Sequence, residues 1–142
     1  MKILTLVSLA FVLNIATSVF ANELISKSPA GASAYFVTPV NGQTVPQKFN
    51  IKFGLKGMGV APAGAKFDNT GHHHILIDTA ELPAMDKSLP ATQKIRHFGG
   101  GQTETELSLE PGTHTLQLLL GNFAHIPHDK PVLSEKITIT VE

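Results

Sequence analysis

Short segments in which apolar and polar residues alternate dominate the chain from residue 34 onward. The clearest segment runs from Phe49 to Leu55, and similar alternation is present at 104–109 and 133–141. A period of two is typical of a half-buried β-strand, and no segment carries the sustained 3.6-residue apolar stripe of an amphipathic helix. Glycine, proline and asparagine separate these segments, as they do in tight turns. The pattern therefore predicts an all-β domain.

Six or seven strands are expected, joined by turns rather than by helices. The expected strands cover residues 34–38, 49–55, 72–78, 104–109, 113–120 and 133–141. Strands of this number and spacing favour an immunoglobulin-like antiparallel β-sandwich of about seven strands. The stretch 57–71, rich in glycine, alanine and proline, is expected to be a loop. The stretch 79–101 has little periodicity and is expected to be a connection with at most a helical turn.

The N-terminus has the features of a secretory signal peptide, which we assign to residues 1–21. A lysine precedes an apolar stretch that is too short for a membrane span of about 20 residues, and small residues follow at the positions that signal peptidase requires. After cleavage, residues 22–33 are expected to form a flexible lead-in and residues 34–142 a single domain. The mature protein is predicted to be periplasmic or secreted, with no membrane contact.

Charge and composition exclude several classes of function. The 142 residues contain 11 basic and 11 acidic side chains, so the chain lacks the excess of positive charge that a nucleic-acid or membrane-surface binder needs. Cysteine is absent, which excludes disulfides, thiolate zinc sites, iron–sulfur clusters and cysteine nucleophiles. No nucleophile signature is present, so we do not expect an enzyme. Histidine, with seven residues, is the residue type in excess.

Three consecutive histidines begin the expected strand 72–78. Because successive side chains of a strand point to opposite faces, His73 shares the core face with Ile75 and Ile77. His72 and His74 then lie side by side on the second face, about 6–7 Å apart at the backbone. Two imidazoles at this spacing can converge on one metal ion, although a stable site needs further ligands.

The expected topology indicates where further ligands come from. In immunoglobulin-like order, the strand at 72–78 pairs antiparallel with the strand at 113–121, and the end of the second strand then lies beside the start of the first. The chain that follows this end contains two more histidines, and the loop at 57–71 brings a methionine thioether to the same end. The predicted metal ligands are therefore His72, His74, His125, His128 and Met58.

The chemistry of this ligand set favours copper over zinc. The donors are imidazoles with a possible thioether and no thiolate, and copper has the higher intrinsic affinity for such a set. The predicted role is metal carriage or buffering. Of the other histidines, His73 is expected to be a hydrogen-bonded core residue, His114 to lie at the opposite end near Asp78, and His97 to belong to either end.

Several segments together resemble a bacterial secreted family catalogued as domain of unknown function 4399. Its most specific parts are Gly71–Asp78, with the three histidines, and Gly101–Glu104, with the sequence Gly-Gln-Thr-Glu. Further matching segments are Phe53-Gly54, Gly57-Met58, Pro62–Gly64 and Pro111–Leu118. The resemblance runs from about Phe36 to Val141. It implies a small exported bacterial protein and supplies no established activity.

Two other functions fit the same residues. The first is a metal-free immunoglobulin-like module whose loops contact a protein, a glycan or the cell wall, so that its partner is a periplasmic protein or an envelope component. The second is a small hydrolase or isomerase that uses a histidine as base. The three glycines at 99–101 favour a flexible entry to the next strand over an anion site, because no lysine and no helix follow them.

Overall fold

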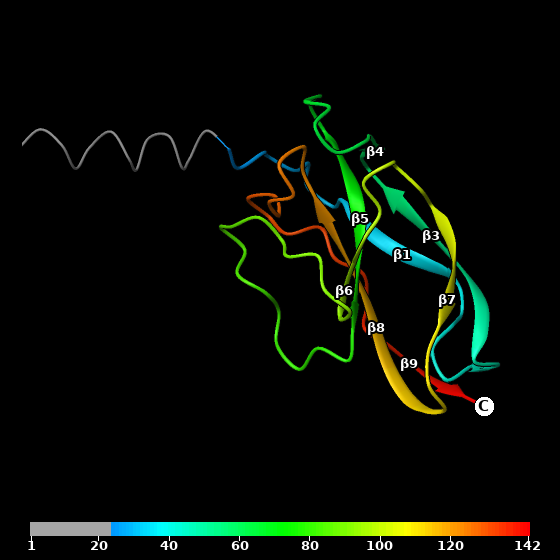
Figure 1. Ribbon diagram of the computed structural model, residues 1–142. Helices are drawn as coiled ribbons and strands as arrows, with labels where there is room; N and C mark the ends of the chain where they lie inside the picture. The colour runs from blue at the N-terminus through cyan, green and yellow to red at the C-terminus, as the bar shows by residue number, and fades with distance from the viewer. Residues whose placement is uncertain (1–23) are drawn as a thin grey trace, which may run out of the picture.

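The computed structural model describes residues 24–142, and the signal peptide that we predict for residues 1–21 lies outside this range. The described chain is all-β, with nine strands in two sheets and no helix (Figure 1). The two sheets pack as a sandwich, which confirms the predicted fold class, although an immunoglobulin-like strand order stays a prediction. Residues 24–142 contain no helix that could cross a membrane.

The smaller sheet has three antiparallel strands in the order β1-β3-β7. Their bounds are β1 (Ser33–Thr38), β3 (Lys48–Lys56) and β7 (Glu104–Ser108). Phe49, Ile51 and Phe53 alternate toward the core. The polar positions between them form ion pairs on the outer face, where charged side chains meet across the strands: Lys48–Glu106 at 2.7 Å and Lys52–Glu104 at 3.3 Å.

The larger sheet has the order β2-β9-β8-β5-β4, and β6 pairs with β5 in addition. The bounds are β2 (Thr44–Val45), β4 (Gly59–Val60), β5 (Thr70–Ile77), β6 (Ile95–His97), β8 (Gly112–Gly121) and β9 (Ile137–Val141). The pairs β2–β9 and β4–β5 are parallel, and the pairs that β8 forms with β5 and β9 are antiparallel. The antiparallel β5–β8 pairing is the one on which the predicted site depends.

One hydrophobic core lies between the sheets. It joins Ile51 and Phe53 of β3 with Ile75 of β5 and Leu118 of β8, all of which are at most 3% exposed. Ile77 belongs to the same core, as the alternation along the triple-histidine strand predicts. Burying these side chains fixes which face of β5 turns inward, because a slip of one residue would reverse every side chain of the strand.

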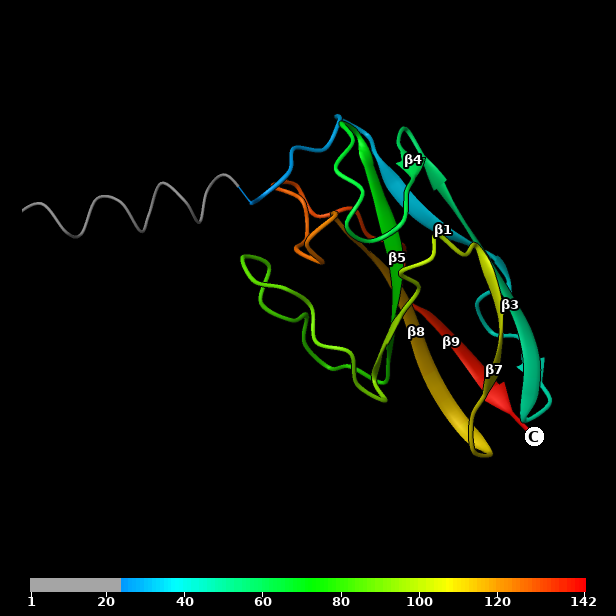
Figure 2. The ribbon, with the colours of Figure 1, turned by 45° about the horizontal axis from the view of Figure 1, so that its top comes forward.

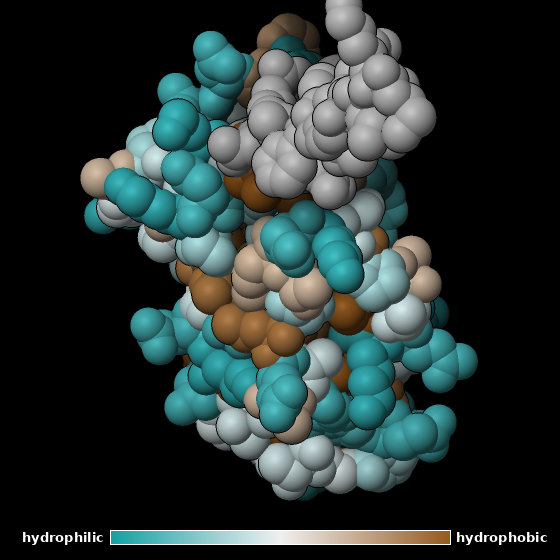
Figure 3. Space-filling view, turned by 90° about the vertical axis from the view of Figure 1, so that its left-hand side faces the viewer, coloured by the Kyte–Doolittle hydropathy of each residue, from teal (hydrophilic) through white to brown (hydrophobic). Residues whose placement is uncertain are grey.

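A layer of irregular chain covers the outer face of β5 and β8. It consists of the connection from β5 to β6 and the connection from β8 to β9, which lie side by side against this face in both ribbon views (Figure 2). A second, smaller apolar cluster forms beneath it: Leu76, Leu89, Ile95 and Leu119. Seen from outside, this side of the molecule carries apolar patches between hydrophilic side chains (Figure 3). As a result, β5 is buried on both faces.

All six expected strands are present, and three short strands were not predicted. Of these, β4 lies inside the expected loop 57–71, and β6 lies inside the connection 79–101, which contains a turn at residues 85–86 and no helix. The last strand begins at Ile137 rather than at Leu133. Its register is interrupted where the Ser134 hydroxyl, and not a backbone carbonyl, accepts the hydrogen bond of the Leu118 amide at 2.8 Å.

Candidate metal centre

The first half of β5 places two imidazoles under the outer layer. His72 pairs with Gly121 of β8, and His74 pairs with Leu119. Both side chains point away from the main core because Ile75 and Ile77 occupy the inner face of the strand. His72 is 0% and His74 1% exposed, so the covering connections close over them completely.

His97 comes from the neighbouring strand β6. The register of β5 and β6 sets His97 directly opposite His74, and directly opposed residues of an antiparallel pair point to the same face. The Phe98 amide donates to the His73 carbonyl at 3.1 Å and so continues the pairing beyond the last residue of the strand. His97 is exposed, and its imidazole is therefore the solvent-facing side of the group.

His125 comes from the turn that follows β8. The Asn122 side-chain oxygen accepts hydrogen bonds from the Ala124 amide at 2.9 Å and the Ile126 amide at 3.1 Å, which holds the turn closed. Within it His125 has a φ of 64°, a left-handed conformation that is uncommon for residues other than glycine. The His125 carbonyl accepts from the Leu89 amide at 2.9 Å, so both covering connections fix this residue.

The four imidazoles form one compact group, which we call the histidine quartet: His72, His74, His97 and His125. Ring centroids are 4.9 Å apart for 72–74, 5.0 Å for 72–97, 4.9 Å for 72–125, 5.1 Å for 74–97, 6.1 Å for 74–125 and 4.6 Å for 97–125. Ring nitrogens of His72, His74 and His97 lie within 4.8 Å of one another. His125 is partly buried, and its ring meets the other three from the turn after β8.

The buried nitrogens of the quartet have no hydrogen-bond partner in the protein. Both ring nitrogens of His72 and of His74 are buried and unpartnered. Burial, together with the neighbouring imidazoles, lowers the pKa of His72 to about 4 and that of His74 to about 3. Both rings are therefore neutral near pH 7, with a nitrogen lone pair free for a metal. Such unpaired polar atoms are rare and costly in a folded protein, and a bound ion is one of the explanations for them.

Two glycines leave the space that the imidazoles fill. A Cβ on Gly121 would lie 2.7 Å from Cε1 of His74 and 3.3 Å from Cα of His125. A Cβ on Gly99 would overlap the His97 ring. Both glycines are close in sequence to members of the quartet, and the sequence analysis assigned neither of them to the site. A glycine on each side of a histidine cluster is the signal that could have identified His97 as a member.

Two predicted ligands lie beside the quartet. The His128 ring is buried, with Nε2 3.2 Å from the Thr70 carbonyl, and it is not among the rings in mutual contact. Burial lowers its pKa, and its Nδ1 has no partner. Met58 is half-buried and precedes Gly59, which pairs with Thr70 at the start of β5. Both residues therefore reach the predicted end of the sandwich, and their role as ligands stays a prediction.

The remaining histidines have structural surroundings. His73 is fully buried in the core, and its ring packs edge-on against Phe53 at 4.8 Å, but its nitrogens have no partner, so the expected hydrogen bond is absent. His114 lies at the other end of β5, as predicted: its Nδ1 is 2.7 Å from the Asp78 carboxylate, and its Nε2 is 2.8 Å from the Glu110 carbonyl.

A family model covers the part of the chain that contains the quartet. The model described as domain of unknown function (DUF4399) matches residues 51–142, which include β5, β6, β8 and all four members of the quartet. The chain belongs to the DUF4399 family. This confirms the resemblance that the sequence motifs indicated. The searches of curated proteins and of solved structures found no match.

The arrangement is suited to holding a metal ion. In this DUF4399 chain, the quartet combines two neutral imidazoles with unpartnered nitrogens, those of His72 and His74, with a solvent-facing ligand, His97, through which an ion can enter. Imidazole is a common ligand of zinc, copper and nickel. The structure therefore contains a histidine cluster that could bind a transition metal, and its members come from three separate segments of the chain.

Proposed function

We propose that this protein is an exported, periplasmic protein that binds a transition metal for carriage or buffering, with copper favoured over zinc. The observation that carries the proposal is the contact of four imidazole rings, two of which, His72 and His74, have buried nitrogens without a hydrogen-bond partner. The rings of His72 and His74 contact other imidazoles, whereas the unpartnered ring of His73 packs against Phe53 in the core. Export rests on the signal peptide predicted for residues 1–21.

The donor set supports copper. No cysteine is available, so the thiolate ligands that are common in structural zinc sites are excluded. For nitrogen ligands the order of intrinsic affinity places copper above zinc. Carriage or buffering fits a site with an exposed member, because His97 offers an incoming or outgoing ion a ligand at the surface.

Equilibrium binding of Cu(I), Cu(II) and Zn(II) to the purified protein tests the proposal. We expect one ion per chain with a dissociation constant below about 1 μM, which is a binding free energy of about 8 kcal/mol. The matched control is His114→Gln, which removes an imidazole outside the quartet and should leave the affinity unchanged. If none of the three metals binds more tightly than about 1 μM, the proposal is wrong.

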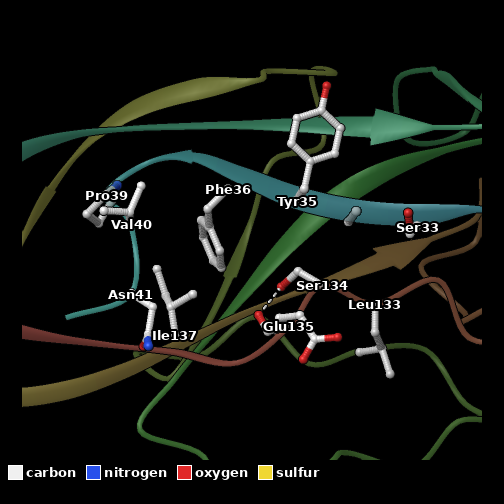
Figure 4. Close-up of a pocket in the computed structure, with 11 residues that line it drawn as sticks. Ser33, Tyr35, Phe36, Pro39, Val40, Asn41, Leu133, Ser134, Glu135 and Ile137 are labelled. Atoms are coloured by element: carbon white, nitrogen blue, oxygen red, sulfur yellow. Dashed lines mark hydrogen bonds between the residues drawn. The ribbon is translucent and has the colours of Figure 1, made fainter. Parts of the chain in front are cut away.

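A metal-free binding module is the second candidate, and a pocket on the far side of the sheet favours it. The pocket has a volume of about 430 Å³ and lies between β1 and residues 133–137. Phe36 points toward Ile137 across it, whereas Tyr35 of the same strand points away (Figure 4). Capture of a partner that survives a chelator and is lost in Val40→Asp, at the exposed rim, would support this function over metal binding.

A further inference from the structure

The spacing of the quartet distinguishes between coordination geometries. With each nitrogen about 2.0 Å from an ion and each ring centroid about 1.1 Å further out, tetrahedral ligands would have centroids about 5.1 Å apart. A square plane would give about 4.4 Å between neighbours and about 6.2 Å across both diagonals.

The observed distances fit the tetrahedron. Five of the six lie between 4.6 and 5.1 Å, and the long one, 6.1 Å for His74–His125, is opposed by 5.0 Å for His72–His97. A square would need both of these distances to be long. Cu(II) prefers square-planar or tetragonal ligand sets, so the quartet is poorly arranged for it.

The charge around the quartet is low. Within residues 24–142, the group of potential metal ligands consists of imidazoles and contains no carboxylate. The nearest acids in sequence are engaged elsewhere: Asp78 contacts His114 and the Thr115 amide, and Asp129 accepts from the Ser28 and Lys130 amides. A divalent ion here would keep its full charge in a buried place. The cost of burying a charge grows with its square, so a monovalent ion is strongly favoured.

The surroundings of the ligands point the same way. A histidine that binds a metal nearly always donates its second ring nitrogen to a carboxylate, a carbonyl or water, which raises the basicity of the ligand. For His72 and His74, neither nitrogen has a protein partner, so whichever nitrogen binds the ion, the other receives no such support. Imidazoles without this support are weaker donors, and a buried divalent ion needs strong donors more than a singly charged ion does.

Resting on the proposed function, we infer that the ion this site selects is monovalent copper, Cu(I), held by the four imidazoles of the quartet in a tetrahedral arrangement. The inference follows from three observations: the near-equal ring spacing, the absence of a carboxylate from the described ligand group, and the unpartnered second nitrogens. Zn(II) also prefers a tetrahedral arrangement of ligands. Discrimination between Cu(I) and Zn(II) therefore depends on the lower charge of Cu(I).

Anaerobic competition against bicinchoninate for Cu(I), and against chelators of known affinity for Cu(II) and Zn(II), tests the inference on the purified protein. We expect Cu(I) to bind at least about a thousandfold more tightly than Cu(II), which places the potential of the bound couple about 180 mV above that of aqueous copper. Cu(I) should also bind more tightly than Zn(II). Equal or tighter binding of Cu(II) or Zn(II) overturns the inference and leaves the proposed function standing, whereas no binding of any ion overturns both.

A pair of variants isolates the effect of charge. His97 is exposed, so His97→Asp and His97→Asn both replace a surface imidazole with side chains of the same shape that differ only in charge. We expect the preference for Cu(I) over Cu(II) to be at least about tenfold smaller in His97→Asp than in His97→Asn, because a carboxylate stabilises the divalent ion. Equal preferences in the two variants contradict the charge argument.

Discussion

The two ends of β5 hold histidines in opposite environments. At the C-terminal end, His114 donates to Asp78 at 2.7 Å and to the Glu110 carbonyl at 2.8 Å, so both ring nitrogens are satisfied, and the hydrogen bond to Asp78 raises its pKa. At the N-terminal end, burial lowers the pKa of His72 and His74, and none of their nitrogens has a partner. The difference shows that satisfied ring nitrogens mark His114 as structural, whereas His72 and His74 combine unpartnered nitrogens with contacts to other imidazoles. Both features are needed, because His73 also lacks hydrogen-bond partners but packs against Phe53 in the core.

The largest expected effect comes from removing the unpartnered imidazoles. In the double variant His72→Leu/His74→Leu we expect no measurable metal binding. The metal-free protein should at the same time become more stable by about 1–3 kcal/mol, because four buried nitrogens without partners are replaced by apolar groups. Metal titration and urea unfolding measure the two effects. Retained metal binding would show that these rings are not the ligands. A marked loss of stability would show that they serve the fold.

Acidification should change the contributions of the two ends to the free energy of unfolding in opposite directions. His72, His73 and His74 have pKa values of about 4, 4 and 3 in the folded protein, against 6.5 when unfolded. The unfolded chain therefore binds more protons as the pH falls below about 6.5, and the free energy of unfolding should decrease by several kcal/mol by about pH 4. Urea unfolding of the metal-free protein across this range checks the slope. A flat profile would contradict the buried, neutral state of these rings.

Replacing the glycine beside the quartet, Gly121, should weaken metal binding more than replacing a glycine elsewhere. In Gly121→Ala the new methyl group displaces the His74 ring, and we expect metal binding at least about tenfold weaker, a change of about 1.4 kcal/mol. Gly59→Ala is the matched control, because its methyl group would meet only Thr70 at an ordinary distance of 3.4 Å. Equal affinities in the two variants would show that the ring has room to move.

The smallest effect is expected at the satisfied end. Asp78→Asn should leave metal affinity unchanged and lower stability by about 1 kcal/mol below pH 6.5, because the partly exposed pair with His114 is screened by solvent. His114 has a raised pKa, so the contribution of this pair is present below the unfolded value of 6.5 and is lost as the pH rises through the folded value. Thermal unfolding at pH 6 and pH 9 measures it, and a loss of metal affinity would contradict the separation of the two ends.

The sequence predicted the part of the site that depends on regular strand geometry. Alternation placed His72 and His74 on one face, and the antiparallel pairing with β8 brought His125 to them. His97 could not be placed, because it lies in a three-residue strand without periodicity whose register with His74 is set by long-range packing. The position of the His128 ring beside the Thr70 carbonyl likewise depends on a loop conformation that the spacing of the histidines in the sequence does not predict.

Long-range ¹H–¹⁵N NMR of the histidine rings tests the central claim most directly, because Cu(I) and Zn(II) are both diamagnetic. On adding one equivalent of Cu(I) or Zn(II) to the purified protein, we expect the resonances of the quartet's ring nitrogens to shift together. The resonances of the His73 and His114 ring nitrogens should not change. A response confined to fewer than three members of the quartet, or a larger response from His114, would contradict a shared metal centre.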